Sequence, residues 1–294
     1  MKFGLGQPVR RREDVRFLKG EGRYVDDIHA ASDLHAFFLR SPAGHARIAS
    51  LDVSAAREAE GVKLVLTWAE IEGRLNPLTN DFPLESTGEG VEPAKPVTMP
   101  HLAKDRVRFV GQPVAMIVAQ TLTQARDAAE LIELELEELP VVVEQRAALE
   151  PGAPELHDEA PGNLAYDWGM GDAEATDAAF ARAAKTVSVE VMNNRIVVAS
   201  LEPRAARIGW DGQRWEIHAG TQGSHNLRGK LARQLGVDAG TIRVLTPDVG
   251  GGFGMKLQAH PEDALIAIGA RDLGAVVRWT ADRSEAFLSD AQGR

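Results

Sequence analysis

A glycine-rich stretch near the carboxyl end of the chain has residue types and spacing that could support chemistry. Residues 250–254 read Gly-Gly-Gly-Phe-Gly, and Lys256 follows two positions later. Glycine costs backbone entropy, but it reaches positive φ and lets the backbone approach another group closely. Bare backbone N–H groups in such a loop can hold anionic or carbonyl oxygens. The stretch therefore predicts a cradle for a ligand, and a flexible turn between two strands is the alternative.

The common phosphate-binding motifs do not fit this stretch. A P-loop requires Gly-Lys followed by Ser or Thr, whereas Met255 separates Gly254 from Lys256. The dinucleotide fingerprint requires a third glycine five positions after the first, and Met255 occupies that position when counting starts at Gly250. We therefore expect a ligand other than a nucleoside triphosphate or NAD.

A glutamine upstream of the loop is a second candidate ligand contact. Gln222 stands between a predicted strand at 215–219 and a predicted helix that starts at Ser224 as its N-cap. Polar side chains at such junctions are commonly presented to ligands. A side-chain amide donates through its nitrogen and accepts through its oxygen. The alternative is an ordinary turn glutamine.

The elements that would position these residues indicate an α+β fold in two parts. In the first part, hydrophobic periodicity and capping residues predict two helices, at 54–60 and 121–130, and strands at 34–40, 48–53, 62–67, 107–119 and 132–137. In the second part they predict helices at 224–235 and 261–273, and strands at 186–192, 205–210, 215–219, 241–245 and 275–280. Residues 76–100 are predicted to form a long surface loop.

Strict alternation of residue types defines the faces of two of these strands. The glutamates of 132–137 should share one solvated face rather than form a metal or acid cluster. The valines of 186–192 should point inward. The tripeptide 202–204, Glu-Pro-Arg, is either a strand-end ion pair or a contact to a cofactor.

Composition excludes several classes of function. The chain has 294 residues and a net charge of −10, which argues against nucleic-acid binding. It has no cysteine, so disulfides and iron–sulfur ligation within this chain are excluded. Its eight histidines lack metal-ligand spacing. No apolar run is long enough to span a membrane, and no secretory signal begins the chain, so we expect a cytoplasmic protein.

Residues 249–256, together with Thr221-Gln222 and with the run Asp-Arg-Ser-Glu at 282–285, resemble the large subunit of the molybdenum hydroxylases. That family comprises xanthine dehydrogenases, aldehyde oxidases and aerobic carbon monoxide dehydrogenases. The resemblance implies an N-terminal arm and an a/b hammerhead domain at 1–148, followed by a linker at 149–175. It also implies that 176–294 form the first part of a molybdopterin-binding domain, truncated at its end.

The resemblance also assigns roles to matching positions. It implies that the residues binding a molybdenum–molybdopterin cofactor, in its cytosine dinucleotide form, are Gln222, Gly251, Gly252, Phe253 and Gly254. Gln222 would hydrogen-bond an oxo ligand of the molybdenum, and Phe253 would either wall the site or be a buried core residue. The family's general-base glutamate has no counterpart before Arg294, so no catalytic residue and no metal ligand is assigned to this chain.

The function implied is that of a molybdopterin-binding subunit of an oxidoreductase, catalytically incomplete by itself. It would oxidise a carbon centre of an aldehyde, an N-heterocycle or carbon monoxide. The expected partners are an iron–sulfur subunit, a FAD-binding subunit and the C-terminal portion of the large subunit. The chain would be a fragment, a truncated product or half of a split subunit. A non-catalytic assembly or binding module that retains the fold is the alternative.

Overall fold

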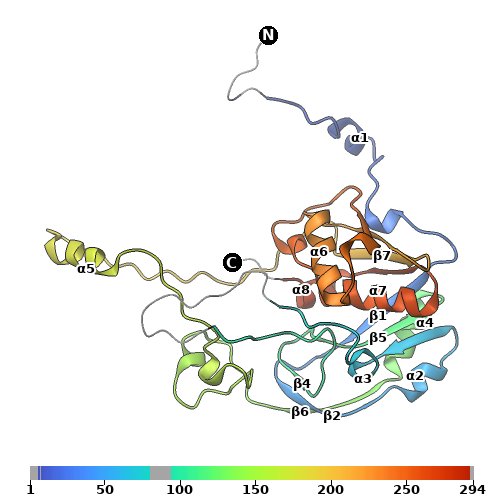
Figure 1. The fold of residues 1–294 in the computed structure, drawn as a ribbon, viewed down its shortest axis with the longest axis horizontal. Coiled ribbons are helices and arrows are strands. Elements are labelled where there is room, and N and C mark those ends of the chain that lie inside the picture. The colour runs from blue at the N-terminus through green and yellow to red at the C-terminus, as the bar shows by residue number, and fades with distance from the viewer. Residues whose placement is uncertain (1–5, 7, 80–93, 292–294) are drawn as a thin grey trace.

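The computed structural model describes residues 6, 8–79 and 94–291, which form two β-sheets with helices packed against them (Figure 1). The strands of the larger sheet are, in spatial order, β3 (Val62–Leu66), β5 (Pro113–Ala119), β1 (Leu34–Arg40), β10 (Val277–Thr280), β7 (Ala205–Trp210), β8 (Trp215–Ala219) and β9 (Ile242–Leu245). The strands of the smaller sheet are β4 (Arg106–Val107), β2 (Ala46–Asp52) and β6 (Glu133–Glu138). This arrangement is the α+β fold predicted from the sequence.

The larger sheet contains strands from both parts of the chain. β1 pairs antiparallel with β5 and parallel with β10, where Leu34 lies opposite Val277. β10 in turn pairs antiparallel with β7. The segment expected to form the hammerhead domain and the segment expected to bind the cofactor therefore share one continuous sheet through β1. The position of a domain boundary within 149–175 stays a prediction.

Strand β5 lies inside the structure with both faces covered. All seven of its residues are buried. Met116 and Val118 belong to the hydrophobic cluster around α7 (Pro261–Leu273), whereas Ala115 and Ile117 belong to a separate cluster with α2 (Ser54–Glu58) and α4 (Leu122–Glu130). Since successive side chains of a strand point to opposite faces, β5 forms part of two cores at once.

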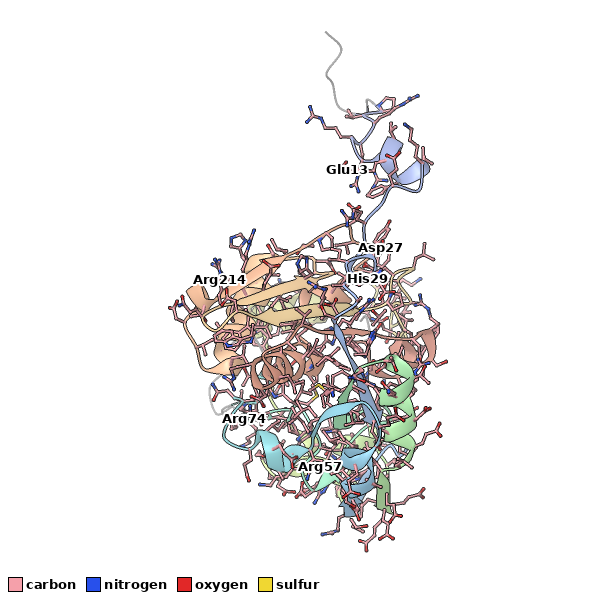
Figure 2. The ribbon with its side chains drawn as sticks, turned by 90° about the vertical axis from the view of Figure 1, so that its right-hand side faces the viewer. Glu13, Asp27, His29, Arg57, Arg74 and Arg214 are labelled. Atoms are coloured by element: carbon pink, nitrogen blue, oxygen red, sulfur yellow. The ribbon has the colours of Figure 1, made fainter. Side chains whose placement is uncertain are left out.

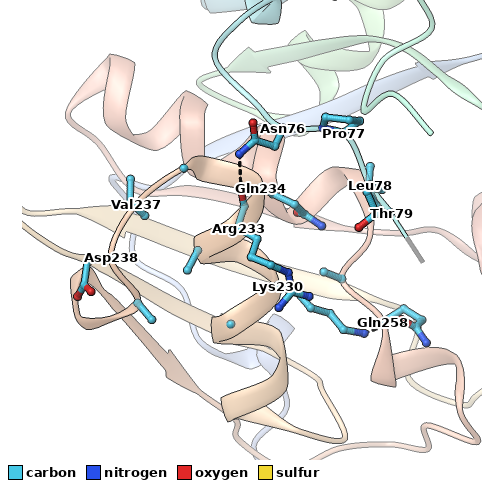
Figure 3. Close-up of a pocket in the computed structure, with 15 residues that line it drawn as sticks. Asn76, Pro77, Leu78, Thr79, Lys230, Arg233, Gln234, Val237, Asp238 and Gln258 are labelled. Carbon is cyan, nitrogen blue, oxygen red and sulfur yellow. Dashed lines mark hydrogen bonds between the residues drawn. The ribbon is translucent and has the colours of Figure 1, made fainter. Parts of the chain in front are cut away.

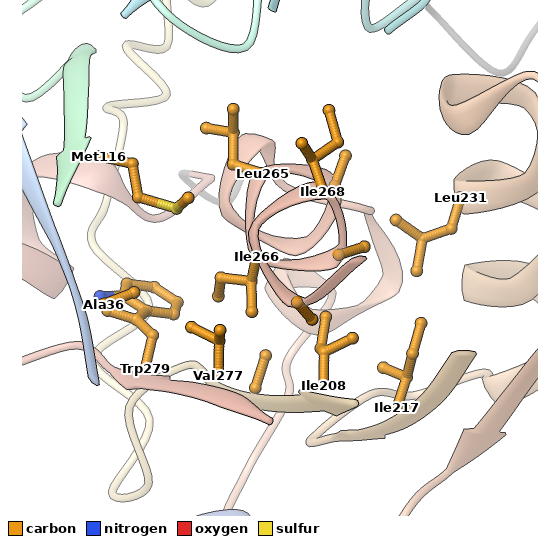
Figure 4. Close-up of a cluster of buried hydrophobic side chains, with 14 of the residues drawn as sticks. Ala36, Met116, Ile208, Ile217, Leu231, Leu265, Ile266, Ile268, Val277 and Trp279 are labelled. Carbon is orange, nitrogen blue, oxygen red and sulfur yellow. The ribbon is translucent and has the colours of Figure 1, made fainter. Parts of the chain in front are cut away.

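Helix α7 is the centre of the larger core. It is apolar on nearly all sides, as expected for a helix surrounded by protein. Figure 4 shows Ile266 pointing from α7 toward Val277 of the sheet, whereas Leu265 and Ile268 point away from the strands, and all three belong to one buried cluster with Met116 and with Leu231 of α6 (Ser224–Leu235). Burying a large aliphatic side chain contributes roughly 1.5–3 kcal/mol, so this helix holds the larger sheet and α6 together.

The smaller sheet confirms the prediction for the alternating glutamates. In β6, Leu134 and Leu136 pack against the cluster that contains Val107, while Glu133 and Glu135 are exposed. These carboxylates are therefore a solvated face of a strand and not an acid cluster.

The remaining helices are short. They are α1 (Asp14–Leu18), α3 (Trp68–Ile71), α5 (Ala173–Arg182), α8 (Arg283–Ser289), and the 3-10 turns η1 (Val25–Asp27), η2 (Ala147–Leu149), η3 (Pro161–Asn163), η4 (Ala239–Thr241) and η5 (Met255–Leu257). None of the helices in the described ranges combines the length and apolar content that a bilayer crossing requires. In Figure 2 the N-terminal arm extends away from the body at Glu13, and Asp27 and His29 mark where it meets the body.

Helix capping follows the sequence at the start of α4 and the end of α7 and departs from it at the start of α6. The Thr121 hydroxyl accepts a hydrogen bond from the Gln124 N–H at the start of α4, and Gly274 ends α7 in the left-handed conformation with φ 58°. The prediction that Ser224 caps α6 is wrong, because Gly223 is the capping residue. The Thr221 hydroxyl accepts from the Gly223 N–H and closes the turn one residue earlier.

Two local predictions, at 186–192 and at 282–285, also need correction, and a helix that the sequence analysis does not predict begins within the range expected to form the linker. The strand predicted at 186–192 is absent from the described structure, where these residues run as an exposed, irregular segment. Helix α5 begins at Ala173, inside the predicted linker, and Figure 1 shows it projecting from the body. The run at 282–285, where the sequence analysis predicts no helix, starts helix α8, with Asp282 accepting from the Glu285 N–H. Residues 80–93 of the predicted surface loop lie outside the described residues.

A buried ionic network connects the two parts of the chain. Arg40 of β1 donates to Glu262 at 2.6 Å, and Arg204 donates to the other oxygen of Glu262 at 2.7 Å and to Asp290 at 2.6 Å. Burial alone raises the pKa of Glu262, but Arg204 and Arg40 outweigh burial and hold that pKa well below its usual range. All of these charges are therefore paired in the folded state.

Replacing Arg204 by methionine should lower the free energy of unfolding by about 3–5 kcal/mol, because Asp290 and one oxygen of Glu262 lose their buried partner. Denaturant titration of the purified chain measures this loss. Arg57→Gln is the matched control, because Arg57 pairs with Glu70 on the surface (Figure 2) and should cost about 0–1 kcal/mol. Equal losses for the two variants would contradict the network's role.

Histidine burial predicts a loss of stability in mild acid. Burial lowers the pKa of His101 to about 4, against smaller opposing effects of Gln234 and Glu262. The unfolded chain therefore binds a proton near pH 6.5 that the folded chain does not, and stability falls by up to about 1.4 kcal/mol per pH unit between roughly pH 6.5 and 4. His101→Gln should reduce this slope in denaturant titrations at pH 7, 6 and 5. Burial also lowers the pKa of His260, to about 3, so part of the slope should persist.

Candidate functional site

The glycine loop, defined here as residues 246–256, follows β9. Glu202 holds the middle of this loop. The Gly250 N–H donates to Glu202 Oε2 at 2.8 Å, and the Glu202 N–H donates back to the Gly250 carbonyl at 3.1 Å. A Cβ atom on residue 250 would lie 2.5 Å from the Glu202 Cβ, which is closer than two carbons can approach. Gly250 is therefore required for close packing against Glu202.

The far end of the loop is held by the same carboxylate. Lys256 is buried, and its Nζ donates to Glu202 Oε2 at 2.8 Å and to the Glu202 carbonyl at 2.9 Å. The ion pair predicted between Glu202 and Arg204 is not observed, because Glu202 pairs with Lys256 while Arg204 pairs with Glu262 and Asp290. The sequence contained no signal for this Glu–Lys pair, because 54 residues separate its members.

Gln222 and the glycine loop meet, as predicted. The Gln222 side-chain Oε1 accepts a hydrogen bond from the Gly254 N–H at 2.8 Å, and the Gln222 backbone N–H donates to the Lys256 carbonyl at 3.0 Å. A Cβ on residue 252 would lie 2.5 Å from Gln222 Oε1, so the amide fills the space that Gly252 leaves. Gln222 is exposed, and with its Oε1 engaged, its Nε2 is the group that can donate to a ligand.

The tip of the loop has an unusual backbone. Phe253 has φ 51°, a conformation that is strained for a bulky residue, and it lies between Gly251 at φ 101° and Gly254 at φ 91°. A Cβ on residue 251 would also come within 2.8 Å of the Phe253 ring. The Phe253 side chain is 75% exposed, so the alternative of a buried core phenylalanine is wrong.

The start of the loop is held by the N-terminal arm. Asp248 accepts a bidentate pair of hydrogen bonds from Arg16, one of them at 2.7 Å, and accepts from the Arg23 N–H at 2.7 Å. The hydrogen bond from Arg16, followed by that from Arg23, lowers the pKa of Asp248 to about 2. The carboxylate is therefore ionised across the physiological pH range.

A cavity of about 750 Å³ lies beside the segment that follows the loop (Figure 3). Residues 76–79, the end of α6, and Gln258 line it. Lys230 donates to the Leu257 carbonyl at 3.2 Å, and Asn76 donates to the Arg233 carbonyl at 2.6 Å. Sequence reasoning missed this cavity because its walls come from segments far apart in the chain.

The described residues offer no metal site of their own. Among them, no group of three or more His, Cys, Asp or Glu side chains could hold a metal ion. What the loop and Gln222 present instead is a set of amide groups, a close approach of bare backbone and one exposed aromatic ring.

Comparison with known families identifies both parts of the chain. The profile described as "Aldehyde oxidase and xanthine dehydrogenase, a/b hammerhead domain" matches residues 19–140. The profile described as "Molybdopterin cofactor-binding domain" matches residues 156–294, which include Gln222 and the glycine loop.

Individual relatives agree with these profiles. The nicotine 6-hydroxylase large subunit of Paenarthrobacter nicotinovorans is 39% identical over 97% of this chain and 34% of its own length. The carbon monoxide dehydrogenase large chain of Hydrogenophaga pseudoflava is 32% identical over 99% of this chain and 36% of its own length. The crystal structure of quinoline 2-oxidoreductase from Pseudomonas putida 86 superposes with a TM-score of 0.86 and 35% identity, over 98% of this chain and 36% of that one.

The fold and these matches together place the chain in the molybdenum hydroxylase class of proteins. The chain belongs to the xanthine dehydrogenase, aldehyde oxidase and aerobic carbon monoxide dehydrogenase family of large subunits, and it corresponds to their N-terminal part. It spans about a third of the length of the curated relatives it matches.

Replacing Gly252 by alanine should displace the Gln222 side chain and remove its hydrogen bond with Gly254. The new methyl group would overlap the flexible end of Gln222, so the side chain rather than the backbone should move. Loss of one such bond is worth about 1 kcal/mol, which corresponds to roughly fivefold faster hydrogen exchange of the Gly254 amide. Exchange measured by NMR reports this change.

Gly229→Ala is the matched control for this prediction. Gly229 lies within α6, and a Cβ there would meet nothing within 4 Å. Alanine should stabilise the helix by up to about 1 kcal/mol and leave Gly254 exchange unchanged. Unchanged Gly254 exchange in Gly252→Ala would show that Gln222 does not depend on the glycine.

Proposed function

We propose that Gln222 and residues 251–254 form one wall of the site that binds a molybdenum–molybdopterin cofactor. The observation that carries the proposal is the direct contact of the Gln222 amide with the Gly254 N–H, over a glycine that leaves room for it. Two segments 32 residues apart thereby present their polar groups at one place. The match of the molybdopterin-binding profile to this region supports the same assignment.

The residues fit such a cofactor chemically. A pterin dithiolene and the oxo ligands of molybdenum are hydrogen-bond acceptors, and the cradle supplies the Nε2 group of Gln222 and backbone amides. Because the Gly254 N–H is used by Gln222, the amides of Gly252 and Phe253 are the backbone donors expected to face the cofactor. The exposed Phe253 ring would cover one side of it.

The bound cofactor supplies the redox chemistry, while this part of the protein orients it. Gln222 would donate to an oxo ligand through Nε2 while its Oε1 stays on Gly254. The glycines would let the backbone approach the pterin, and the Glu202–Lys256 pair would keep the loop in place. We further propose the cytosine dinucleotide form of the pterin and a cytoplasmic location.

The reaction that this arrangement serves is the oxidation of a carbon centre by a multi-subunit oxidoreductase. The substrate class is an aldehyde, an N-heterocycle or carbon monoxide, and the general-base glutamate belongs to the remaining part of the large subunit. The partners that we propose are an iron–sulfur subunit, a FAD-binding subunit and the C-terminal portion of the large subunit, and these 294 residues contain no cysteine to hold an iron–sulfur cluster. The names "large subunit" and "large chain" of the relatives support such an assembly.

The test is the molybdenum and pterin content of the complex purified with this chain, together with a Gln222→Ala variant. The wild-type complex should contain both components. The variant should hold at least severalfold less cofactor, because a hydrogen bond to a charged group contributes about 1.5–3 kcal/mol. Gln213→Ala, in the exposed turn between β7 and β8, should leave the content unchanged. A wild-type complex with neither molybdenum nor pterin would favour the non-catalytic module.

A further inference from the structure

Residues 247–249, at the start of the glycine loop, depend on the N-terminal arm for their hydrogen bonds. The Asp248 N–H donates to the Arg23 carbonyl at 3.0 Å, and Asp248 Oδ2 accepts from the Arg23 N–H at 2.7 Å. The guanidinium of Arg16 binds both oxygens of the same carboxylate. Within the described ranges, 247–249 form hydrogen bonds with no other segment. The start of the loop is therefore fixed by residues 225 or more positions away in the sequence.

The arm itself is anchored to the larger sheet. Asp26 accepts a hydrogen bond from the Thr280 hydroxyl at 2.7 Å and forms an ion pair with Arg278, and both partners belong to β10. The neighbouring side chain of Val25 is buried. The stretch that contacts Asp248 is therefore joined to a fixed base rather than to a free end.

The path of the loop tip, residues 251–253, depends on contacts on both of its sides, because glycine by itself reaches most backbone conformations. On the downstream side, the loop is hydrogen-bonded at Gly254. On the upstream side, it is hydrogen-bonded at Gly250 and at Asp248. A chain attached at one residue can still pivot there, whereas attachment at two residues also fixes its direction. The contact at Asp248 therefore fixes, together with Gly250, the direction in which the chain enters the tip.

The contact from Arg16 is suited to placing the loop rather than to stabilising the fold. The side chains of Arg16 and Asp248 are 38% and 14% exposed, and partly exposed ion pairs contribute little to the free energy of unfolding. A guanidinium that binds both oxygens of a carboxylate nevertheless fixes the orientation of that carboxylate. Loss of Arg16 should therefore change the orientation of Asp248 while the fold stays intact.

We infer that Arg16 is a positioning residue for the cofactor and that the N-terminal arm holds the glycine loop in the conformation that binds it. By orienting Asp248, Arg16 sets the direction in which the backbone enters the loop tip, and with it the direction of the Gly252 and Phe253 amides. The inference rests on the proposed function, because it concerns how long the molybdenum–molybdopterin cofactor stays bound.

Hydrogen exchange of single amides, measured by NMR on the 294-residue chain, tests the contact between arm and loop without the cofactor. Arg16→Met should speed exchange of the Asp248 amide, which donates to the arm, at least about tenfold, and exchange of the Gly250 amide about threefold. Arg11→Met is the matched control, because Arg11 lies in the same arm but pairs with Asp14, and both amides should then exchange as in the wild type. Unchanged exchange of the Asp248 amide in Arg16→Met overturns the inference.

The rate at which the cofactor is lost tests the positioning role. The complex purified with this chain is incubated, and the molybdenum that stays bound is measured over time. Arg16→Met should lose molybdenum at least about threefold faster than the wild type, and Arg16→Lys should fall between the two, because an ammonium keeps the charge but not the planar fork. The denaturant midpoint should stay near the wild-type value in both variants, so that unfolding does not account for the loss. Equal rates of loss in Arg16→Met and the wild type overturn the inference.

A double variant shows whether Arg16 acts through Asp248. In Asp248→Ala, Arg16 has no carboxylate left to bind at this place, so adding Arg16→Met should not speed the loss of molybdenum further. Rates that multiply in the double variant would show that Arg16 acts through another contact, which contradicts the inference.

The cofactor measurements also separate this inference from the proposed function. If Gln222→Ala loses the cofactor while Arg16→Met retains it as the wild type does, the positioning role of Arg16 alone is refuted. If the wild-type complex holds neither molybdenum nor pterin, the proposed function is refuted, and the positioning role of Arg16 with it, whatever the exchange of the Asp248 amide shows.

Discussion

A partly buried carboxylate, Glu202, holds both the middle and the end of the glycine loop, and the position of the candidate site depends on it. Taking a carboxylate out of water is costly unless a partner and hydrogen bonds compensate. Glu202 meets that condition through Lys256 Nζ and the Gly250 N–H, both at 2.8 Å from Oε2. Its Oε1 is buried without a hydrogen-bond partner among the described residues. A loop of four glycines would otherwise be flexible, and the contacts of Glu202 help to hold this backbone in one conformation.

Beneath the loop, a second set of buried charges keeps the two parts of the chain in register. Arg204 follows Glu202 by two residues and pairs with Glu262 at the start of α7, which also accepts from Arg40 of β1. The loop, the central helix and the sheet shared by both parts are thus connected through charged contacts over apolar packing. Interiors pack densely, so a displacement at one of these contacts would be transmitted to the others.

The same structure leaves one region exposed. Hydrogen bonds hold the glycine loop at three places: the N-terminal arm bonds Asp248, Glu202 bonds Gly250, and Gln222 bonds Gly254. The segment after α5, by contrast, exposes valines that alternate as in a strand.

Local chemistry was readable from the sequence alone. The glycine spacing and Gln222, the capping box at Thr121, the alternation of β6 and the resemblance to the family each depend on neighbouring residues, whose periodicity and backbone preferences act within one element. Tertiary structure decided the rest. Lys256 pairs with Glu202, which lies 54 residues away in the sequence. Phe253 is exposed and has a strained backbone conformation. Residues 186–192, predicted as a strand, pair with no other strand among the described residues. Pairing of strands and of buried charges depends on what lies across the fold, and that information is not contained in any short stretch of sequence.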